Sequence, residues 1–150
     1  MSLRLALLTF GASLGMAIAA PAIALNSDAD DSKDAIKLEA ARANAADPVK
    51  TVRFIRAIDS YEVIGGTSVL VWETNTKAWL VEVRAGESCQ ARHLDRSWAV
   101  GLEAAYDTMN TSNGYVVGRD RMRCKITEIR EVNVPAMREA QRTAQMASTD

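Results

Sequence analysis

The sequence predicts a small α+β or mostly β domain, with an antiparallel sheet closed by one disulfide and with weakly docked terminal helices. Two neighbouring apolar segments, residues 68–73 and 78–84, have the length and composition of strands and are separated by a short polar turn. Residues 51–133 hold both cysteines, all 3 tryptophans and all 3 tyrosines, whereas residues 25–50 and 134–150 are polar and rich in alanine. We therefore expect one disulfide-linked β-rich core, residues 51–133, between two helical ends.

Residues 1–24 are typical of a secretory signal peptide. Arg4 supplies a positive start, residues 5–20 form an uncharged apolar run, and small residues lead to a cleavage position near Ala24. The rival interpretation is an uncleaved membrane anchor, since the run is about long enough to span a bilayer. No cysteine near the cut offers a site for a lipid anchor. We expect a periplasmic or secreted protein of about 125 residues, the size of one domain, with no membrane span after cleavage.

Residues 25–50 are interpreted as a polar helical lead-in. Ser32 is expected to cap the helix, Asp34 lies in the first turn, and Pro48 ends it. Ile36 and Leu38 are the only large aliphatic residues on its apolar face, so the helix is expected to be weakly docked or mobile.

Residues 134–150 are interpreted as a helical or disordered tail. Pro135 suits the first helical position. The apolar stripe is narrow because it consists mostly of alanine, so fraying is expected. The stripe comprises Met137, Ala140, Ala144 and Ala147. The alternative is a helix that binds a partner.

The central hairpin is the clearest element. The segment "SVLVWE" follows a turn at Gly65 and Gly66 and is apolar on both faces, which indicates a strand buried on both sides. The turn "TNTK" leads to "AWLVEVR", whose alternation places Trp79, Val81 and Val83 on the inner face. Residues 98–105 are expected to form a strand or a short helix, and "TMNTSNGY" a polar loop.

The last predicted strand, "GRDRMRCKITEI" at residues 118–129, has two contrasting faces. Cys124 and Ile126 lie on the inner face, and the alternation breaks after Ile126, as a bulge or the end of the strand would cause. The outer face carries a row of four basic side chains, Arg119, Arg121, Arg123 and Lys125, here called the basic row.

The basic row has two interpretations. As a binding site, it would take an anionic glycan, anionic lipid headgroups or an acidic envelope protein, because arginine suits phosphate and carboxylate groups. As a solvated face, it would be neutralised by Glu82 or Glu73 on a neighbouring strand. The chain has 18 basic and 19 acidic residues, so no overall positive charge draws it to nucleic acid.

Known catalytic and metal-binding motifs are absent from the sequence, so we assign no catalytic residues, no metal and no cofactor. His93 is the only histidine and has no partner at motif spacing. Cys89 and Cys124 are too far apart for a redox C-x-x-C pair, and an even cysteine count in an exported chain favours a disulfide. A reactive free thiol is the alternative.

A resemblance to a known family rests on several matched segments. They are "IRAIDSYEVIGGTSVLV", the strand at residues 79–81, Cys89 shortly after it, and C-x-I-x-x-I at Cys124, Ile126 and Ile129. Over residues 53–132 the chain resembles an uncharacterised family of small exported bacterial proteins, classed as a domain of unknown function. The resemblance implies a location in the Gram-negative envelope and a paired-cysteine core, and it implies no activity. Many relatives carry a lipid-attachment cysteine that this chain lacks.

These observations favour an exported, non-enzymatic binding or structural module of unknown ligand, whose working surface is an exposed sheet face or the polar loop. One alternative is an unrecognised, hydrolase-like envelope enzyme, which would gather His93 with Asp95, Asp107 or Asp120 in a pocket. The other is an accessory subunit of an envelope complex, whose terminal helices become ordered on a partner.

Overall fold

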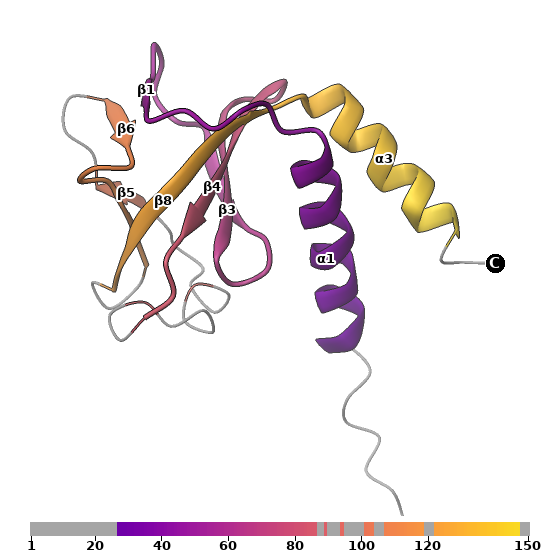
Figure 1. Cartoon of the computed structure of the whole chain (residues 1–150). Helices are drawn as coiled ribbons and strands as arrows, with labels where there is room; N and C mark the ends of the chain where they lie inside the picture. Colours follow the sequence, from indigo (N-terminus) through magenta and orange to yellow (C-terminus); the bar gives the residue numbers. More distant parts are fainter. Residues whose placement is uncertain are drawn as a thin grey trace, which may run out of the picture.

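The computed structural model describes residues 27–86, 89, 94, 101–103, 107–118 and 122–147. The predicted signal peptide, His93, Arg119 and Arg121 lie outside these residues. In chain order the elements are α1 (Ser27–Ala43), β1 (Thr51–Arg53), β2 (Ser60–Val63), β3 (Ser68–Thr74), β4 (Lys77–Val83), β5 (Gly101–Glu103), β6 (Thr108–Asn110), β7 (Tyr115–Val117), β8 (Arg123–Val132) and α3 (Val134–Ala147). Figure 1 shows the helices on one side of the strands and β1 and β6 on the other.

The strands form an antiparallel sheet in the order β2-β3-β4-β8-β7-β5, and β1 pairs separately with β6. The predicted hairpin is confirmed as β3 and β4, with Val71 opposite Trp79. Every residue of β3 except Trp72 and Thr74 is buried, as the two apolar faces predict. The predicted fold class, a mostly antiparallel sheet with two helices and a disulfide, is therefore confirmed.

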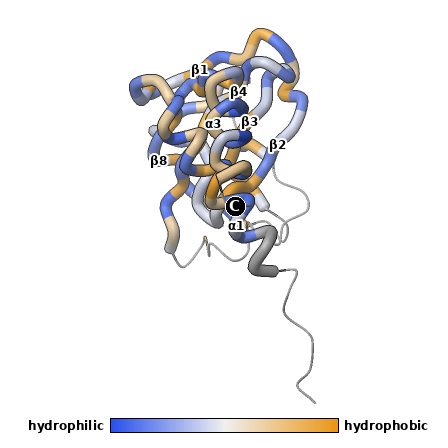
Figure 2. Tube along the Cα trace, turned by 90° about the vertical axis from the view of Figure 1, so that its right-hand side faces the viewer, coloured by the Kyte–Doolittle hydropathy of each residue, from blue (hydrophilic) through white to orange (hydrophobic). Residues whose placement is uncertain are grey.

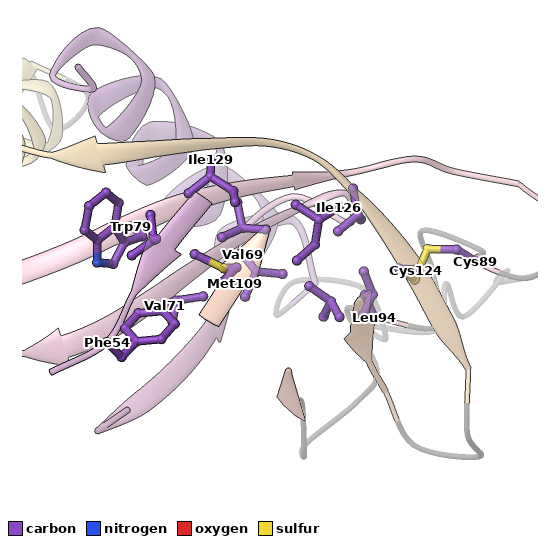
Figure 3. Packing of buried hydrophobic residues seen from close by; sticks show 14 residues of the cluster. Phe54, Val69, Val71, Trp79, Cys89, Leu94, Met109, Cys124, Ile126 and Ile129 are labelled. Atoms are coloured by element: carbon purple, nitrogen blue, oxygen red, sulfur yellow. A yellow bond between two sulfur atoms is a disulfide. The ribbon is translucent and has the colours of Figure 1, made fainter. Parts of the chain in front are cut away.

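Each face of the sheet has its own hydrophobic core. On the face covered by β1 and β6, alternate residues of β3, β4 and β8 pack with the β6 residue Met109 and with Phe54 (Figure 3). On the helix-covered face, Leu70 and Leu80 pack with Ala41 and Met137. Figure 2 shows most of the strongly apolar trace within this body of strands. The sheet therefore lies between two apolar layers, which explains why its central strands lack a polar face.

A β-bulge in β8 explains why the predicted alternation stops after Ile126. Val83 is opposite Ile126 and Glu82 is opposite Glu128, so Thr127 is an extra residue on β8. The extra residue keeps Ile126 and Ile129 on the same face of the sheet, and both belong to the core beneath β1 and β6.

Helix α1 begins before the predicted cap Ser32 and ends at Ala43, well before Pro48. Both predicted boundaries of the helix are therefore wrong. The reason for the early end is that the next residues form backbone hydrogen bonds with the edge of β8. Ala46 N donates to Glu131 O at 2.8 Å, and Val49 N donates to Ile129 O at 2.8 Å.

Each helix contacts the sheet mainly through one end. Ala40 and Ala41 near the end of α1 are buried, as are Val134 and Met137 at the start of α3. Asn133 caps α3, because its Oδ1 accepts a hydrogen bond from Ala136 N at 3.2 Å.

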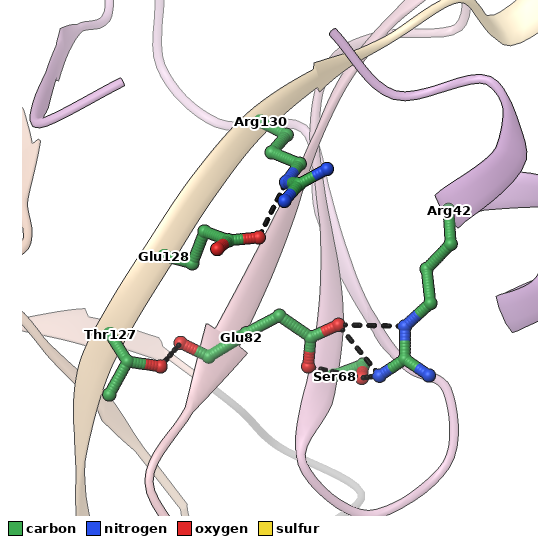
Figure 4. A network of polar contacts seen from close by, with 6 residues as sticks. All are labelled: Arg42, Ser68, Glu82, Thr127, Glu128 and Arg130. Carbon is green, nitrogen blue, oxygen red and sulfur yellow. Dashed lines mark hydrogen bonds and ion pairs between the residues drawn. The ribbon is translucent and has the colours of Figure 1, made fainter. Parts of the chain in front are cut away.

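A polar network fastens α1 to the sheet (Figure 4). The Arg42 side chain donates to Glu82 Oε1 through Nε at 3.1 Å and through Nη2 at 2.9 Å. The hydroxyl of Ser68, which is fully buried, donates to Glu82 Oε2 at 2.6 Å. Because both oxygens of Glu82 have partners, this carboxylate on the helix-covered face is well accommodated.

The Cys89–Cys124 disulfide is present, with a Cα–Cα distance of 4.9 Å. Cys89 forms a tight bridge with Gly86 after β4, and Cys124 lies near the start of β8. Both cysteines are buried in the core with Ile126, at the opposite end from Phe54 and Trp79 (Figure 3). The bond therefore connects the segment after the hairpin to the inner face of the last strand, as predicted.

Two predictions about loops and strands are wrong. The segment predicted as a polar loop contains β6, whose central residue Met109 is fully buried, followed by a turn at residues 111–113. The strand predicted from Gly118 begins at Arg123, since Gly118 N donates to Met122 O at 2.9 Å in the connection from β7. For β6, the local sequence pattern was overridden by long-range pairing with β1.

Candidate functional site

A pocket of about 280 Å³ lies beside the end strands β2 and β5 of the sheet. Its apolar part combines two aromatic rings with the aliphatic side chains of Ile58 and Leu102, and Arg56 and Asp107 add opposite charges. We call it the Tyr61 pocket; its lining residues are Phe54, Arg56, Ala57, Ile58, Tyr61, Leu102 and Asp107. The lining is mixed, with somewhat more polar than apolar surface, and binding sites combine apolar surface with polar groups that fix the orientation of a ligand.

Tyr61 connects the two ends of the sheet. The side chain projects from β2, is partly buried against the core, and lines the same pocket as Leu102 on β5. Burial raises the pKa of the Tyr61 hydroxyl, and the nearby backbone of Leu102 opposes that effect. The sheet is therefore curved until its two end strands approach each other, and the pocket lies where they approach.

The wall of the pocket formed by Asp107 has an unusual backbone. Asp107 has a φ of 54°, a left-handed conformation that is uncommon for a residue other than glycine but tolerated by aspartate. Its carbonyl oxygen accepts a hydrogen bond from Phe54 N at 2.9 Å. This bond joins the turn before β6 to the segment after β1, so two pocket residues from distant parts of the chain are held together.

An ion pair between a buried glutamate and a partly exposed lysine joins β3 and β4. Glu73 is 7% exposed, and its Oε2 lies 2.9 Å from Lys77 Nζ. The hydrogen bond from Lys77 lowers the pKa of the Glu73 carboxyl, although burial opposes this effect; the Lys77 charge, Trp79 and the Ile55 backbone also lower it. Trp79 Nε1 faces the carboxylate without completing a hydrogen bond of normal geometry.

Ile55 is the most exposed large apolar residue in the described part of the chain. Its side chain is 88% exposed. The segment that begins at Phe54 therefore presents an apolar side chain to solvent directly after a buried aromatic residue. Such a surface next to a pocket is typical of a contact site.

The structure describes two of the four residues of the basic row, Arg123 and Lys125, and both have partners. Arg123 forms a two-pronged ion pair with Glu103, with Nε to Oε2 at 2.7 Å and Nη2 to Oε1 at 2.9 Å. Arg123 and Lys125 also lie over the Tyr115 ring, at 4.2 Å and 5.2 Å from its centre. Glu103 thus takes the neutralising role predicted for Glu82 or Glu73.

Among the described residues, Glu82 and Glu73 pair with Arg42 and Lys77, so neither neutralises Arg123. Anion binding by the basic row stays a prediction, since Arg119 and Arg121 lie outside the described residues.

Of the four residues that an enzyme pocket was expected to gather, only Asp107 lies in the described part of the chain. His93, Asp95 and Asp120 lie outside the described residues. Within the described ranges, no group of three or more histidine, cysteine, aspartate or glutamate side chains is placed to hold a metal ion. The described helices also include none that is long and apolar enough to cross a membrane.

Sequence reasoning missed the Tyr61 pocket. Its residues come from three separate stretches, at 54–61, 102 and 107, and the short strands that bring them together carry little periodicity. A usable signal lies in "FIRAI", where Ile55 and Ile58 follow neither strand nor helix spacing. Apolar residues without a period indicate an irregular segment whose side chains cannot all be buried.

Comparison with known proteins gives a family and no activity. No curated protein and no solved structure matches the chain. The family match extends beyond the resemblance seen in the sequence and takes in both described helices. The match over residues 5–148 shows that the chain belongs to a family of unknown function, DUF6491.

Proposed function

We propose that this chain is an exported binding module whose ligand places an apolar group in the Tyr61 pocket. The observation that carries the proposal is the pocket itself, in which Phe54, Tyr61 and Leu102 provide apolar surface next to the opposite charges of Arg56 and Asp107. Apolar surface supplies affinity and the few charged groups orient a ligand. The exposed side chain of Ile55 beside the pocket extends the apolar contact surface.

Export to the periplasm or the exterior is the second part of the proposal. Residues 1–24 have the charge, the apolar run and the small residues of a signal peptide. The buried Cys89–Cys124 disulfide is compatible with an oxidising compartment, where such bonds form and persist. Mass spectrometry of the protein from its native host tests this part: we expect a mature N-terminus after Ala24, and an intact Met1 would contradict it.

Small apolar probes test the pocket. The probes are N-acetyl-leucine methylamide and toluene, titrated into the ¹⁵N-labelled full mature chain. We expect the amide signals of Tyr61 and Leu102 to shift most. Ala57→Phe fills the pocket with a larger side chain and is expected to abolish the shifts. Ala147→Phe makes the same change at an exposed position on α3 and should leave them unchanged. Shifts that survive Ala57→Phe would refute the pocket as the binding site.

A further inference from the structure

The outer edge of β2 offers unpaired backbone groups. Within the described residues β2 is an end strand and pairs only with β3. Ile64 N donates to Ser68 O at 2.8 Å. Because backbone groups alternate in direction along an antiparallel strand, Glu62 also faces β3. The N–H and C=O groups of Tyr61 and Val63 therefore point away from β3, towards the open edge.

The same alternation shows which backbone groups point outwards from β5, the strand at the other end of the sheet. Ile126 N donates to Gly114 O at 3.1 Å, which makes Gly114 and Ile126 a hydrogen-bonded pair between β7 and β8. Backbone direction alternates along β7 from this pair. The register between β7 and β5 then places the backbone groups of Leu102 on the outer edge of β5. That is where Leu102 meets the Tyr61 side chain. Within the described part of the chain, two strand edges that lack a strand partner thus border one pocket, with Tyr61 between them.

The separation of these edges suits one additional strand. Tyr61 on β2 and Leu102 on β5 line one pocket, and a tyrosine side chain with a polar contact at its hydroxyl spans about two strand spacings, about 9–10 Å. The Tyr61 side chain lies on the core side of the sheet, packed against the core beneath β1 and β6. An extended chain can therefore lie along the outer edge of β2, with the Tyr61 ring on its core side.

We propose that an extended peptide segment of a partner protein adds to the outer edge of β2 and inserts one apolar side chain into the Tyr61 pocket. The proposal deepens the proposed function and rests on it. In such an arrangement, main-chain hydrogen bonds supply affinity and alternate side chains supply specificity. The peptide residue opposite Tyr61 has its side chain on the same face as the Tyr61 ring, and that face opens into the pocket.

The size of the pocket supports a single side chain as its occupant. A volume of about 280 Å³ lies just below the range of about 300–1,000 Å³ for sites that enclose small molecules. One leucine or phenylalanine side chain needs less room and would leave its peptide backbone on β2. Arg56 and Asp107 then lie beside the anchor residue, where they can contact the flanking residues of the peptide.

Selection of peptides tests the proposal directly. A phage-displayed library of twelve-residue peptides is selected on the full mature protein, and the enriched sequences are made as fluorescent peptides for polarisation measurements. We expect an alternating pattern with one invariant apolar anchor, and a loss of binding of at least tenfold when glycine replaces the anchor. Selection with no enrichment over the starting library would overturn the proposal.

Two variants of one residue separate backbone pairing from side-chain packing. Val63→Pro removes an N–H that points away from β3, so the bonds between β2 and β3 remain, and proline is tolerated on an edge strand. Val63→Ala keeps that N–H. We expect Val63→Pro to weaken peptide binding at least tenfold and Val63→Ala to change it by less than threefold. Equal losses in the two variants would overturn strand addition.

A measurement on the unmodified protein keeps the test independent of how well the proline variant folds. Hydrogen exchange with and without the selected peptide should show new protection at the amides of Tyr61 and Val63. Unchanged exchange there would overturn the proposal, as would a dimer of the protein alone that Val63→Pro dissociates, because a second copy would then occupy the edge. If the small probes still bind in a way that Ala57→Phe abolishes, the proposed function stands and only strand addition falls.

Discussion

The Cδ2 atom of Leu38 on α1 lies 2.9 Å from the position that a Cβ would occupy on Gly65. Gly65 has a φ of +76°, in the left-handed region that suits glycine. The turn before β3 therefore needs glycine for its backbone, and α1 approaches that turn closely enough to use the space left by the missing side chain. Lys37 adds an ion pair to Glu62 on β2.

Gly65→Ala should lower the free energy of unfolding by about 1–3 kcal/mol, because a left-handed alanine is strained and Leu38 must move. Urea denaturation measures the change. Gly86→Ala is the matched control, since no atom lies within 4 Å of its Cβ position. Equal stability of the two variants would contradict the close approach of α1 to the turn.

Removal of the disulfide by the double substitution C89A/C124A should cost about 3–4 kcal/mol of unfolding free energy. The bond closes a segment with a sequence separation of 35, and a cross-link restricts the unfolded chain by about this amount. Urea denaturation of the double variant and of the reduced wild type should give similar midpoints. A loss below about 1 kcal/mol would show that the bond contributes little beyond the contacts around it.

Glu73→Gln should remove a part of the stability that depends on pH. The pKa of Glu73 is lowered in the folded protein, chiefly by Lys77, from an ordinary value of 4.5. Its contribution is therefore present above pH 4.5 and is lost as the pH falls through the lower folded pKa. We expect wild type to be more stable than Glu73→Gln at pH 7 and the difference to shrink below pH 4.

The control for Glu73→Gln is Glu139→Gln on α3, where the glutamate side chain is 66% exposed and pairs with Arg142. An exposed pair contributes about 0–1 kcal/mol, so this variant should stay close to wild type at both pH values. A difference between wild type and Glu73→Gln that does not change with pH would contradict the lowered pKa.

Tyr61→Phe should remove a tyrosine whose ionisation is shifted to higher pH by burial. Burial raises the pKa of Tyr61 above 10.0, so phenolate absorbance at alkaline pH should include a late step in wild type that the variant lacks. Tyr115→Phe should keep that step. Because the folded protein holds this proton more tightly, stability falls as the pH rises through the folded pKa. Loss of the late step in Tyr115→Phe would contradict the assignment.

The sequence predicted the parts of the fold that have strong local periodicity. The faces of β3 and β4, the break after Ile126 and the inward position of Cys124 all follow from side-chain alternation. The predictions failed where short strands are paired over long distances. The pairing of Val52 with Met109 joins two three-residue strands from distant parts of the chain, and neither strand has a recognisable pattern.

The Tyr61 pocket was missed for the same reason. Tyr61 and Leu102 meet only because the sheet curves, and curvature arises from twist and bulges that no single segment specifies. The basic row was interpreted more fully than its pattern allowed, since alternation places Arg123 and Lys125 on one face but does not reveal that Glu103 arrives from β5.

Strand β8 has a consequence for the order in which the chain is made. It pairs with β4 on one edge and, on the other, with β7 and the segment after α1, and its residues enter both cores. It is also the last of the described strands in chain order. Neither core can be completed until β8 has left the ribosome, because most of its contacts are with residues made much earlier. The segments that precede β8 therefore stay incompletely packed until β8 itself has been made.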